Sequence, residues 1–158
     1  MRSDSREKTK TFLNRRLSHD FFIGKTLEAG IVLSGTEIKS LRGGNCVIEK
    51  SFVHFDRCGR PVWLNGYIDA YKFGTSENHE PTRSRFLLLH KREIDELRGA
   101  LERRGESIFP VKLYFKHGLA KLEIAICRAK KQYDKRQDLK KRVEEREMAR
   151  SVRSRRAR

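Results

Sequence analysis

Residues that could bind RNA gather near the start of the chain, at Asn14, Arg15, Arg16 and His19. Guanidinium groups pair with phosphates, and an asparagine amide offers both a donor and an acceptor to the edge of a base. A histidine ring beside them can stack on a base or donate a hydrogen bond to a phosphate. These residue types together predict a contact with RNA.

A carboxylate further along the chain, Glu28, is a less obvious candidate, because phosphates repel it. It becomes useful where it accepts hydrogen bonds from the Watson–Crick edge of an unstacked guanine, which a lysine cannot do. Arg83 and Arg85 are predicted to contact phosphates, with plain exposed charge as the alternative. Thr36 and Glu37 are predicted either to cap a helix or to contact RNA directly.

No motif gathers residues for catalysis or metal binding. An enzyme that processes nucleic acid needs clustered carboxylates or a nucleophile beside a base, but the acidic candidates are scattered, at Glu37, Asp56, Asp69 and Glu93. The five histidines lack metal-ligand spacing, and Cys46, Cys58 and Cys127 form no C-x-x-C pair. We therefore expect a protein that is not an enzyme, holds no metal or cofactor, and keeps free thiols in a reducing cytoplasm.

The charge of the chain indicates a polyanionic partner. The 158 residues carry a formal net charge of +16, with a pI of about 10.2. Nucleic acid is the first candidate and an acidic membrane surface the second. The membrane alternative is weak, because no apolar run approaches the roughly 20 residues that span a bilayer and residues 1–20 lack the apolar core of a signal peptide.

The elements that must position these residues are mostly short strands. Strand-like runs cover residues 46–55, 62–71, 86–89, 108–115 and 121–128, with hairpin loops at 56–60 and 117–118. The run 86–89 has the composition of a buried strand. Residues 91–104 have the apolar spacing of a helix that ends at Gly105. This pattern predicts a mainly β fold with short helices (α+β), arranged as a small closed antiparallel barrel with two or three packed helices.

The segment 28–42 changes from strand to helix within a few residues. Apolar residues alternate over 29–33, and Ser34 and Glu37 then form an S-x-x-E capping box before a short helix. Gly43-Gly44 ends that helix, because glycine enters the left-handed region without strain.

Three parts follow along the chain. Residues 1–13 are predicted to be a mobile arm, residues 14–128 the RNA-binding domain, and residues 129–158 a basic tail. Residues 128–158 contain 14 Lys/Arg and 5 Asp/Glu, a net charge of +9, with too few apolar positions to fold alone. We expect this tail to be disordered when free and helical when bound.

Four ordered blocks resemble the SsrA-binding protein (small protein B) family. They are Asn14-Arg15-Arg16-Leu17-Ser18-His19-Asp20-Phe21-Phe22-Ile23, the segment 28–42, Arg83-Ser84-Arg85-Phe86-Leu87-Leu88-Leu89-His90, and Lys130-Lys131-Gln132-Tyr133-Asp134-Lys135-Arg136. Four blocks at matching spacings are more specific than any one of them. The chain departs from the family at Ala129, where a glycine usually precedes the paired lysines, which puts a hinge between body and tail in doubt.

The resemblance implies an oligonucleotide-binding-like barrel and a role in trans-translation, the rescue of stalled bacterial ribosomes. The barrel would bind the tRNA-like domain of transfer-messenger RNA (SsrA RNA). Leu88 matches the leucine that the family uses against flipped-out bases, with an ordinary core position as the alternative. The predicted RNA-binding set is Asn14, Arg15, Arg16, His19, Glu28, Thr36, Glu37, Lys39, Arg42, Arg83, Arg85 and Leu88.

By the same resemblance, the tail would enter the decoding region and the vacant mRNA channel of the ribosome. The residues predicted to make contacts there are Lys130, Lys131, Tyr133, Asp134, Lys135 and Arg136. The resemblance also implies two protein partners, which are alanyl-tRNA synthetase and elongation factor Tu, the factor that delivers aminoacyl-tRNA. We expect the protein to be a monomer in the cytoplasm. An ordinary ribosomal protein, or another general binder of structured RNA, is the alternative function.

Overall fold

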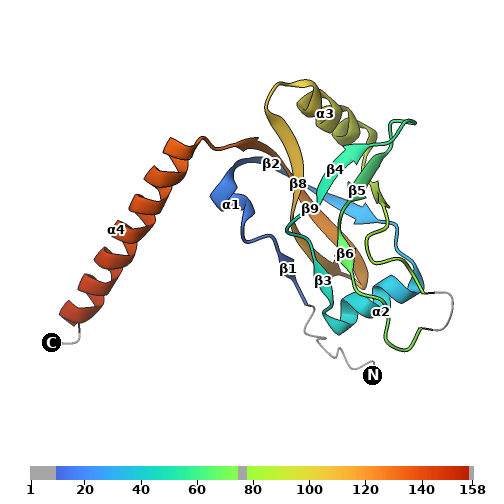
Figure 1. The fold of residues 1–158 in the computed structure, drawn as a ribbon, viewed down its shortest axis with the longest axis horizontal. Helices are drawn as coiled ribbons and strands as arrows, with labels where there is room; N and C mark the ends of the chain where they lie inside the picture. The colour runs from blue at the N-terminus through green and yellow to red at the C-terminus, as the bar shows by residue number, and fades with distance from the viewer. Residues whose placement is uncertain (1–9, 75–77, 157–158) are drawn as a thin grey trace.

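The computed structural model describes residues 10–74 and 78–156, with side chains as far as residue 152. The described elements are β1 (Phe12–Leu13), α1 (Leu17–Asp20), β2 (Phe21–Ile31), α2 (Gly35–Gly43), β3 (Cys46–Val47), β4 (Phe52–Phe55), β5 (Pro61–Leu64), β6 (Tyr67–Ile68), β7 (Arg85–Leu88), α3 (Lys91–Glu102), β8 (Glu106–Lys116), β9 (Leu119–Ala129) and α4 (Gln132–Arg156). Figure 1 shows the strands gathered in one body and α4 projecting away from it.

The main sheet closes on itself. Its strands follow the order β1-β8-β4-β5-β7-β2-β9, and β9 also pairs with β8, so the strands from β8 to β9 form a ring with β1 attached outside it. The pairings are antiparallel, and the long hairpin of β8 and β9 joins Lys116 to Leu119 across a turn. In that turn His117 and Gly118 have φ of +51° and +77°. The expected mainly β fold with helices is therefore confirmed.

The core fills the inside of this ring. Trp63, Leu113, Leu122 and Ile124 are fully buried there, and Leu41 of α2 and Leu97 of α3 join them. A smaller cluster of Leu17, Ala125 and Cys127 lies under α1. No described residue of α4 belongs to either cluster, so the body holds together without the tail.

The predicted capping box of α2 is present. Ser34 N donates to Glu37 Oε2 at 2.7 Å, and Glu37 N donates to Ser34 Oγ at 3.4 Å. Gly44 follows the helix with φ of +92°, the left-handed conformation that a residue without Cβ adopts freely. The sequence thus places both ends of this helix correctly.

Four expectations differ from the structure. Residues 12–13 of the predicted mobile arm pair with β8, whereas residues 1–9 lie outside the described part. The run 86–89 is not a buried strand, because Phe86 and Leu88 of β7 point to solvent while Leu87 points inward. The return strand predicted over 62–71 is divided: β5 stays in the ring and β6 pairs with β3. The tail, predicted to become helical on binding, lies in a continuous helix, α4.

Candidate nucleic-acid interface

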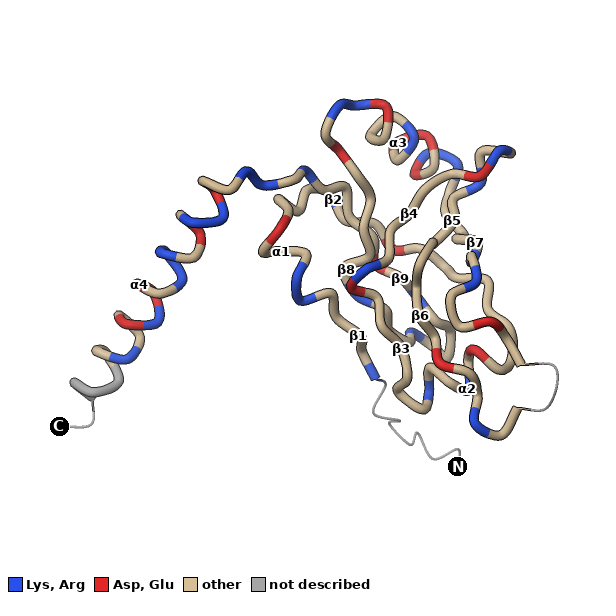
Figure 2. The backbone as a smooth tube through the Cα atoms, in the orientation of Figure 1, with Lys and Arg blue, Asp and Glu red and all other residues tan. Residues whose placement is uncertain are grey.

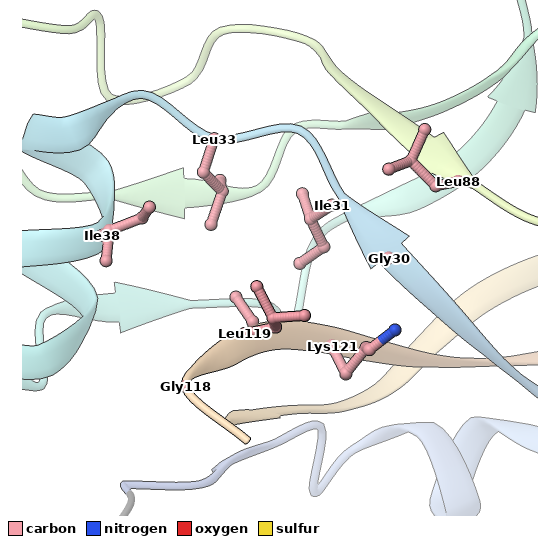
Figure 3. Close-up of a pocket in the computed structure, with 9 residues that line it drawn as sticks. Gly30, Ile31, Leu33, Ile38, Leu88, Gly118, Leu119 and Lys121 are labelled. Atoms are coloured by element: carbon pink, nitrogen blue, oxygen red, sulfur yellow. The ribbon is translucent and has the colours of Figure 1, made fainter. Parts of the chain in front are cut away.

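An apolar groove of about 180 Å³ opens where β2, β7 and the β8–β9 turn meet α2. In Figure 3, Ile31, Leu33 and Ile38 line one side and Leu119 lies opposite them. Leu88 and Leu119 are 61% and 64% exposed although both are leucines. Aliphatic side chains held at a groove mouth can cover the face of an unstacked base, because every base has an apolar face.

Charged groups adjoin one end of this groove. Glu28, Leu88 and Lys121 line an adjoining depression, together with residues 89, 90 and 93. Strand register explains the arrangement: Gly30 pairs with both Leu88 of β7 and Lys121 of β9. A base in the groove would therefore have an apolar surface, a carboxylate and an ammonium group within one short stretch of sheet.

Glu28 is already held in position. The hydroxyl of Tyr114 donates to Glu28 Oε2, and Lys116 Nζ lies 3.2 Å from both carboxylate oxygens. The hydrogen bond from Tyr114 and the charge of Lys116 lower the pKa of Glu28, while the same carboxylate raises the pKa of Tyr114 to about 12. Glu28 is thus ionised and can only accept hydrogen bonds, as the predicted base-reading role requires.

The N-terminal cluster divides between surface and interior. Arg15, Arg16 and His19 are exposed, and His19 Nδ1 is 3.0 Å from Asp20 Oδ1. Asn14 is buried, and its Nδ2 donates to Pro110 O at 3.0 Å. The side chain of Asn14 therefore joins the end of β1 to β8, and its predicted contact with a base edge stays a prediction.

Two other predicted RNA ligands are buried. Arg85 and Glu37 are both 0% exposed, with Arg85 Nε 2.7 Å from Glu37 Oε1. Arg85 also donates to the carbonyls of Gly66 and Pro81. Burial alone would raise the pKa of Glu37, but hydrogen bonds from Arg83, the Ser34 amide and Arg85 outweigh it and leave the pKa lowered. This pair joins α2 to β7, and neither side chain is exposed for the predicted RNA contact, which stays a prediction.

The remaining members of the predicted set lie on or beside α2. Arg83 is one-third exposed and donates to Glu37 Oε1 at 2.8 Å. Thr36 Oγ1 is hydrogen-bonded to His79 Nδ1 at 2.9 Å, and Lys39 and Arg42 are exposed. Thr36 therefore has a structural partner, while the two cations are open to solvent.

A few polar contacts hold the start of the tail against the body. Lys130 Nζ donates to Ser18 O at 2.8 Å and to Asp138 Oδ2 at 2.5 Å, and Lys135 Nζ lies 2.8 Å from Asp20 Oδ1. Beyond them, basic residues with fewer acidic ones follow the described side chains of α4 (Figure 2). Lys131, Tyr133 and Arg136 are exposed, so half of the predicted tail motif faces solvent.

Sequence reasoning missed four residues of the groove region: Tyr114, Lys116, Leu119 and Lys121. Their alternation along β8 and β9 was visible as a period of two. Two pairings place them beside Glu28: β2 pairs with β9, which aligns Glu28 with Glu123, and β9 pairs with β8, which carries Tyr114 and Lys116. Pairing between strands almost a hundred residues apart leaves no local signal.

The described part of the chain lacks two kinds of feature. No group of three or more His, Cys, Asp and Glu side chains there could hold a metal ion. No helix among the same residues is long and apolar enough to cross a membrane.

A family model described as "SmpB protein" matches residues 11–154. The chain belongs to the SmpB family. Among its relatives, an SsrA-binding protein of Geobacter sulfurreducens is 49% identical over 89% of this chain and 91% of that protein. An SsrA-binding protein of Oceanobacillus iheyensis is 48% identical over 88% of this chain and 90% of its own length.

A solved structure is similar to this SmpB-family chain as well. It is described as "tmRNA-SmpB: a journey to the center of the bacterial ribosome", with a TM-score of 0.65 and 40% identity. The match covers 82% of this chain and 94% of the solved one. The groove and the tail thus lie in a chain whose relatives are named for binding SsrA RNA.

Proposed function

We propose that this protein binds the tRNA-like domain of transfer-messenger RNA and acts with it on stalled ribosomes in trans-translation. Membership of the SmpB family supports this, as does a similar solved chain described with transfer-messenger RNA at the ribosome. The observation that carries the proposal is the groove: exposed Leu88 and Leu119 beside an ionised, pre-positioned Glu28. A cytoplasmic monomer without enzyme activity fits this role.

The closed ring of strands would act as an oligonucleotide-binding-like barrel. An unstacked loop base would cover Leu88, while Glu28 accepts hydrogen bonds from its edge and Lys121 neutralises nearby phosphate. Contacts to phosphate or ribose would set the register of the RNA on the protein. The residues that would make them are Arg15, Arg16, His19, Lys39, Arg42 and Arg83.

The tail would extend into the vacant mRNA channel. An empty channel is lined by RNA phosphate, and residues 128–158 carry a net charge of +9. Specific contacts with the ribosome would come from the start of the tail, through Lys130, Lys131, Tyr133, Asp134, Lys135 and Arg136. Elongation factor Tu and alanyl-tRNA synthetase stay predictions from family resemblance.

The test is to purify the tagged protein from a bacterial lysate and to sequence the RNA that it retains. Transfer-messenger RNA should be enriched over bulk tRNA, because tRNA shares the charge and the overall shape but not the complete set of unstacked loop bases. Equal recovery of all tRNAs would reject the proposal. Recovery of ribosomal RNA from cells that lack transfer-messenger RNA, at an unchanged level, would favour a ribosomal protein.

A further inference from the structure

A second candidate RNA contact lies beside α2, in the turn Tyr71–Gly74. Phe73 is 83% exposed, more than any other large apolar side chain of the described residues. Its ring is 5.7 Å from that of Tyr71 at an interplanar angle of 67°. Phe73 is thus a largely exposed aromatic ring that contacts a half-buried one, and an apolar surface of this kind can form part of a binding site.

The turn that carries Phe73 is held by specific hydrogen bonds. Tyr71 N donates to Asn78 Oδ1 at 3.2 Å, and Asn78 Nδ2 donates to Tyr71 O at 2.8 Å, so the Asn78 side chain pairs with both backbone groups of Tyr71 at the start of the turn. Gly74 N also donates to Tyr71 O at 2.9 Å. A Cβ on Gly74 would lie 2.6 Å from Asn78 Nδ2, so the turn requires glycine at this place.

The same segment is fastened to α2 on both sides of the turn. Ser40 Oγ donates to Asp69 O at 2.6 Å, and His79 Nδ1 is 2.9 Å from Thr36 Oγ1. Figure 1 shows this segment running past α2 after β6. These contacts fix the backbone on either side of the turn, and the edge-to-face contact with Tyr71 is the interaction of the Phe73 ring itself.

Positive charge surrounds the aromatic pair. Lys39 Nζ lies 5.4 Å from the centroid of the Tyr71 ring. Lys72 is exposed between the two aromatic residues, and Arg42 is exposed one turn further along α2. Aromatic rings that alternate with cations are the two components that bind unstacked nucleotides: the ring stacks on the base and the cation pairs with the phosphate.

We propose that the Phe73 platform, defined as Phe73 and Tyr71 with Lys39, Arg42 and Lys72, stacks one unstacked base of transfer-messenger RNA. The inference rests on the proposed function and extends it to a second site. Continuity selects this RNA over others: Ile38 of α2 lines the Leu88 groove, and Lys39 follows it directly toward the platform. An RNA strand that continued from the groove along α2 would meet Lys39 and the platform.

The test compares full-length variants for binding to the tRNA-like domain of transfer-messenger RNA. Phe73→Ala should weaken binding about 5- to 150-fold, the range for losing one base–aromatic stack. Phe73→Trp should bind like the wild type, because it restores a stacking ring. Phe86→Ala is the matched control, since Phe86 is also exposed, with the Arg60 guanidinium 4.3 Å from its ring, but lies on β7 outside the platform.

Two further readouts separate stacking from simple loss of charge or fold. In Phe73→Trp, the new indole is exposed whereas Trp63 is fully buried, so acrylamide-accessible emission comes from position 73 and should be quenched by RNA. Phe73→Ala should leave the slope of log K against log salt unchanged, whereas Lys72→Gln should reduce it by about 0.7–0.9.

Wild-type affinity for Phe73→Ala, or unquenched emission, would overturn the platform while leaving the proposed function intact. The platform proposal would also be wrong if Phe73→Ala weakened only the binding of the protein to ribosomes in the absence of transfer-messenger RNA. The stacked base would then belong to ribosomal RNA. If the wild-type protein shows no preference for transfer-messenger RNA, both proposals fail together.

Discussion

At the scale of single residues, two glutamates illustrate how environment assigns a role. Glu37 is fully buried, accepts hydrogen bonds from two arginines and the Ser34 amide, and has no surface with which to contact RNA. Glu28 is exposed, and its partners Tyr114 and Lys116 hold it beside the groove without covering it. The same carboxylate is structural in one case and available for recognition in the other.

Glu28→Gln should weaken binding of the tRNA-like domain by about 1–3 kcal/mol, the contribution of a good base-specific pair. The amide keeps the size of the side chain but replaces an acceptor with a donor. Glu123→Gln is the matched control: Glu123 pairs with Glu28 across β2 and β9, and its replacement removes the same charge. It should leave affinity unchanged or raise it slightly. Titrations in which both variants bind equally, or in which Glu28→Gln binds more tightly, would contradict base reading.

Glu37→Gln should lower the free energy of unfolding by about 3–5 kcal/mol, because it leaves Arg85 charged and buried without its ionic partner. Urea denaturation measures this change. The control is Glu49→Gln, since Glu49 is exposed and lies 4.0 Å from Arg16, a surface pair that contributes at most about 1 kcal/mol. Similar decreases in the two variants would show that the buried pair is not a major stabilising contact.

The same carboxylate predicts a pH dependence. The pKa of Glu37 is lowered in the folded protein, so its contribution to stability is fully present above the pKa of the unfolded chain. That contribution is lost as the pH falls from about 4.5 through the lower folded value. The wild type should therefore lose stability over this range more steeply than Glu37→Gln. Parallel stability–pH curves would contradict this assignment.

At the scale of elements, α2 and α4 connect the parts of the molecule. One face of α2 is fixed by Leu41 in the core, Ile38 lines the groove, and Lys39 faces the platform. The capping box and Gly44 fix both ends of this helix, so they also fix the spacing of the two sites. Helix α4 differs, because the contacts between the tail and the body are polar ones made by Lys130, just before the helix, and by Lys135 in its first turn.

The ion pair between Asp20 and Lys135 should help to set the direction of α4. A helix of 25 residues is about 37 Å long, so a small rotation at its base moves its far end by many ångströms. Spin labels on Cys58, which is exposed, and on a cysteine introduced by Met148→Cys should give a broader distance distribution after Asp20→Asn.

The exchanged pair Asp20→Lys with Lys135→Asp should narrow that distribution again, while Glu144→Gln on α4 should leave it unchanged. If Asp20→Asn does not alter the distribution, the backbone and Lys130 alone orient the helix.

At the scale of the whole molecule, local patterns predicted local structure well. The capping box, both hairpin turns and α3 depend on residues close in sequence, and each is present where expected. The burial of Arg85 was not predictable in this way, because Glu37, Gly66 and Pro81 reach it only after β5, β7 and α2 assemble. The tail is helical over Gln132–Arg156, as its strong helix formers favour, whereas apolar spacing alone predicted helix only in the bound state.

The division between body and tail gives the most demanding prediction. Truncation after Ala129 removes 13 Lys/Arg and 5 Asp/Glu, a net +8 of the +16, yet every buried core residue of the described chain lies at or before Cys127. The truncated protein should fold, as judged by an unchanged urea midpoint, and should still select transfer-messenger RNA. Its affinity should be less sensitive to salt, because the salt slope falls by about 0.7–0.9 for each phosphate that the protein no longer neutralises.

What the truncated protein should lose almost completely is tagging of stalled nascent chains in a reconstituted translation reaction. In the proposed function the tail would fill a channel lined by phosphate, and messenger RNA in that channel would exclude the tail because it occupies the same volume. A matched pair of variants separates position from bulk charge. Alanine at Lys130, Lys131, Lys135 and Arg136 should impair tagging more than alanine at Arg153, Arg155, Arg156 and Arg158, which removes as many cations. Near-normal tagging by the truncated protein would mean that the tail is an inert appendage.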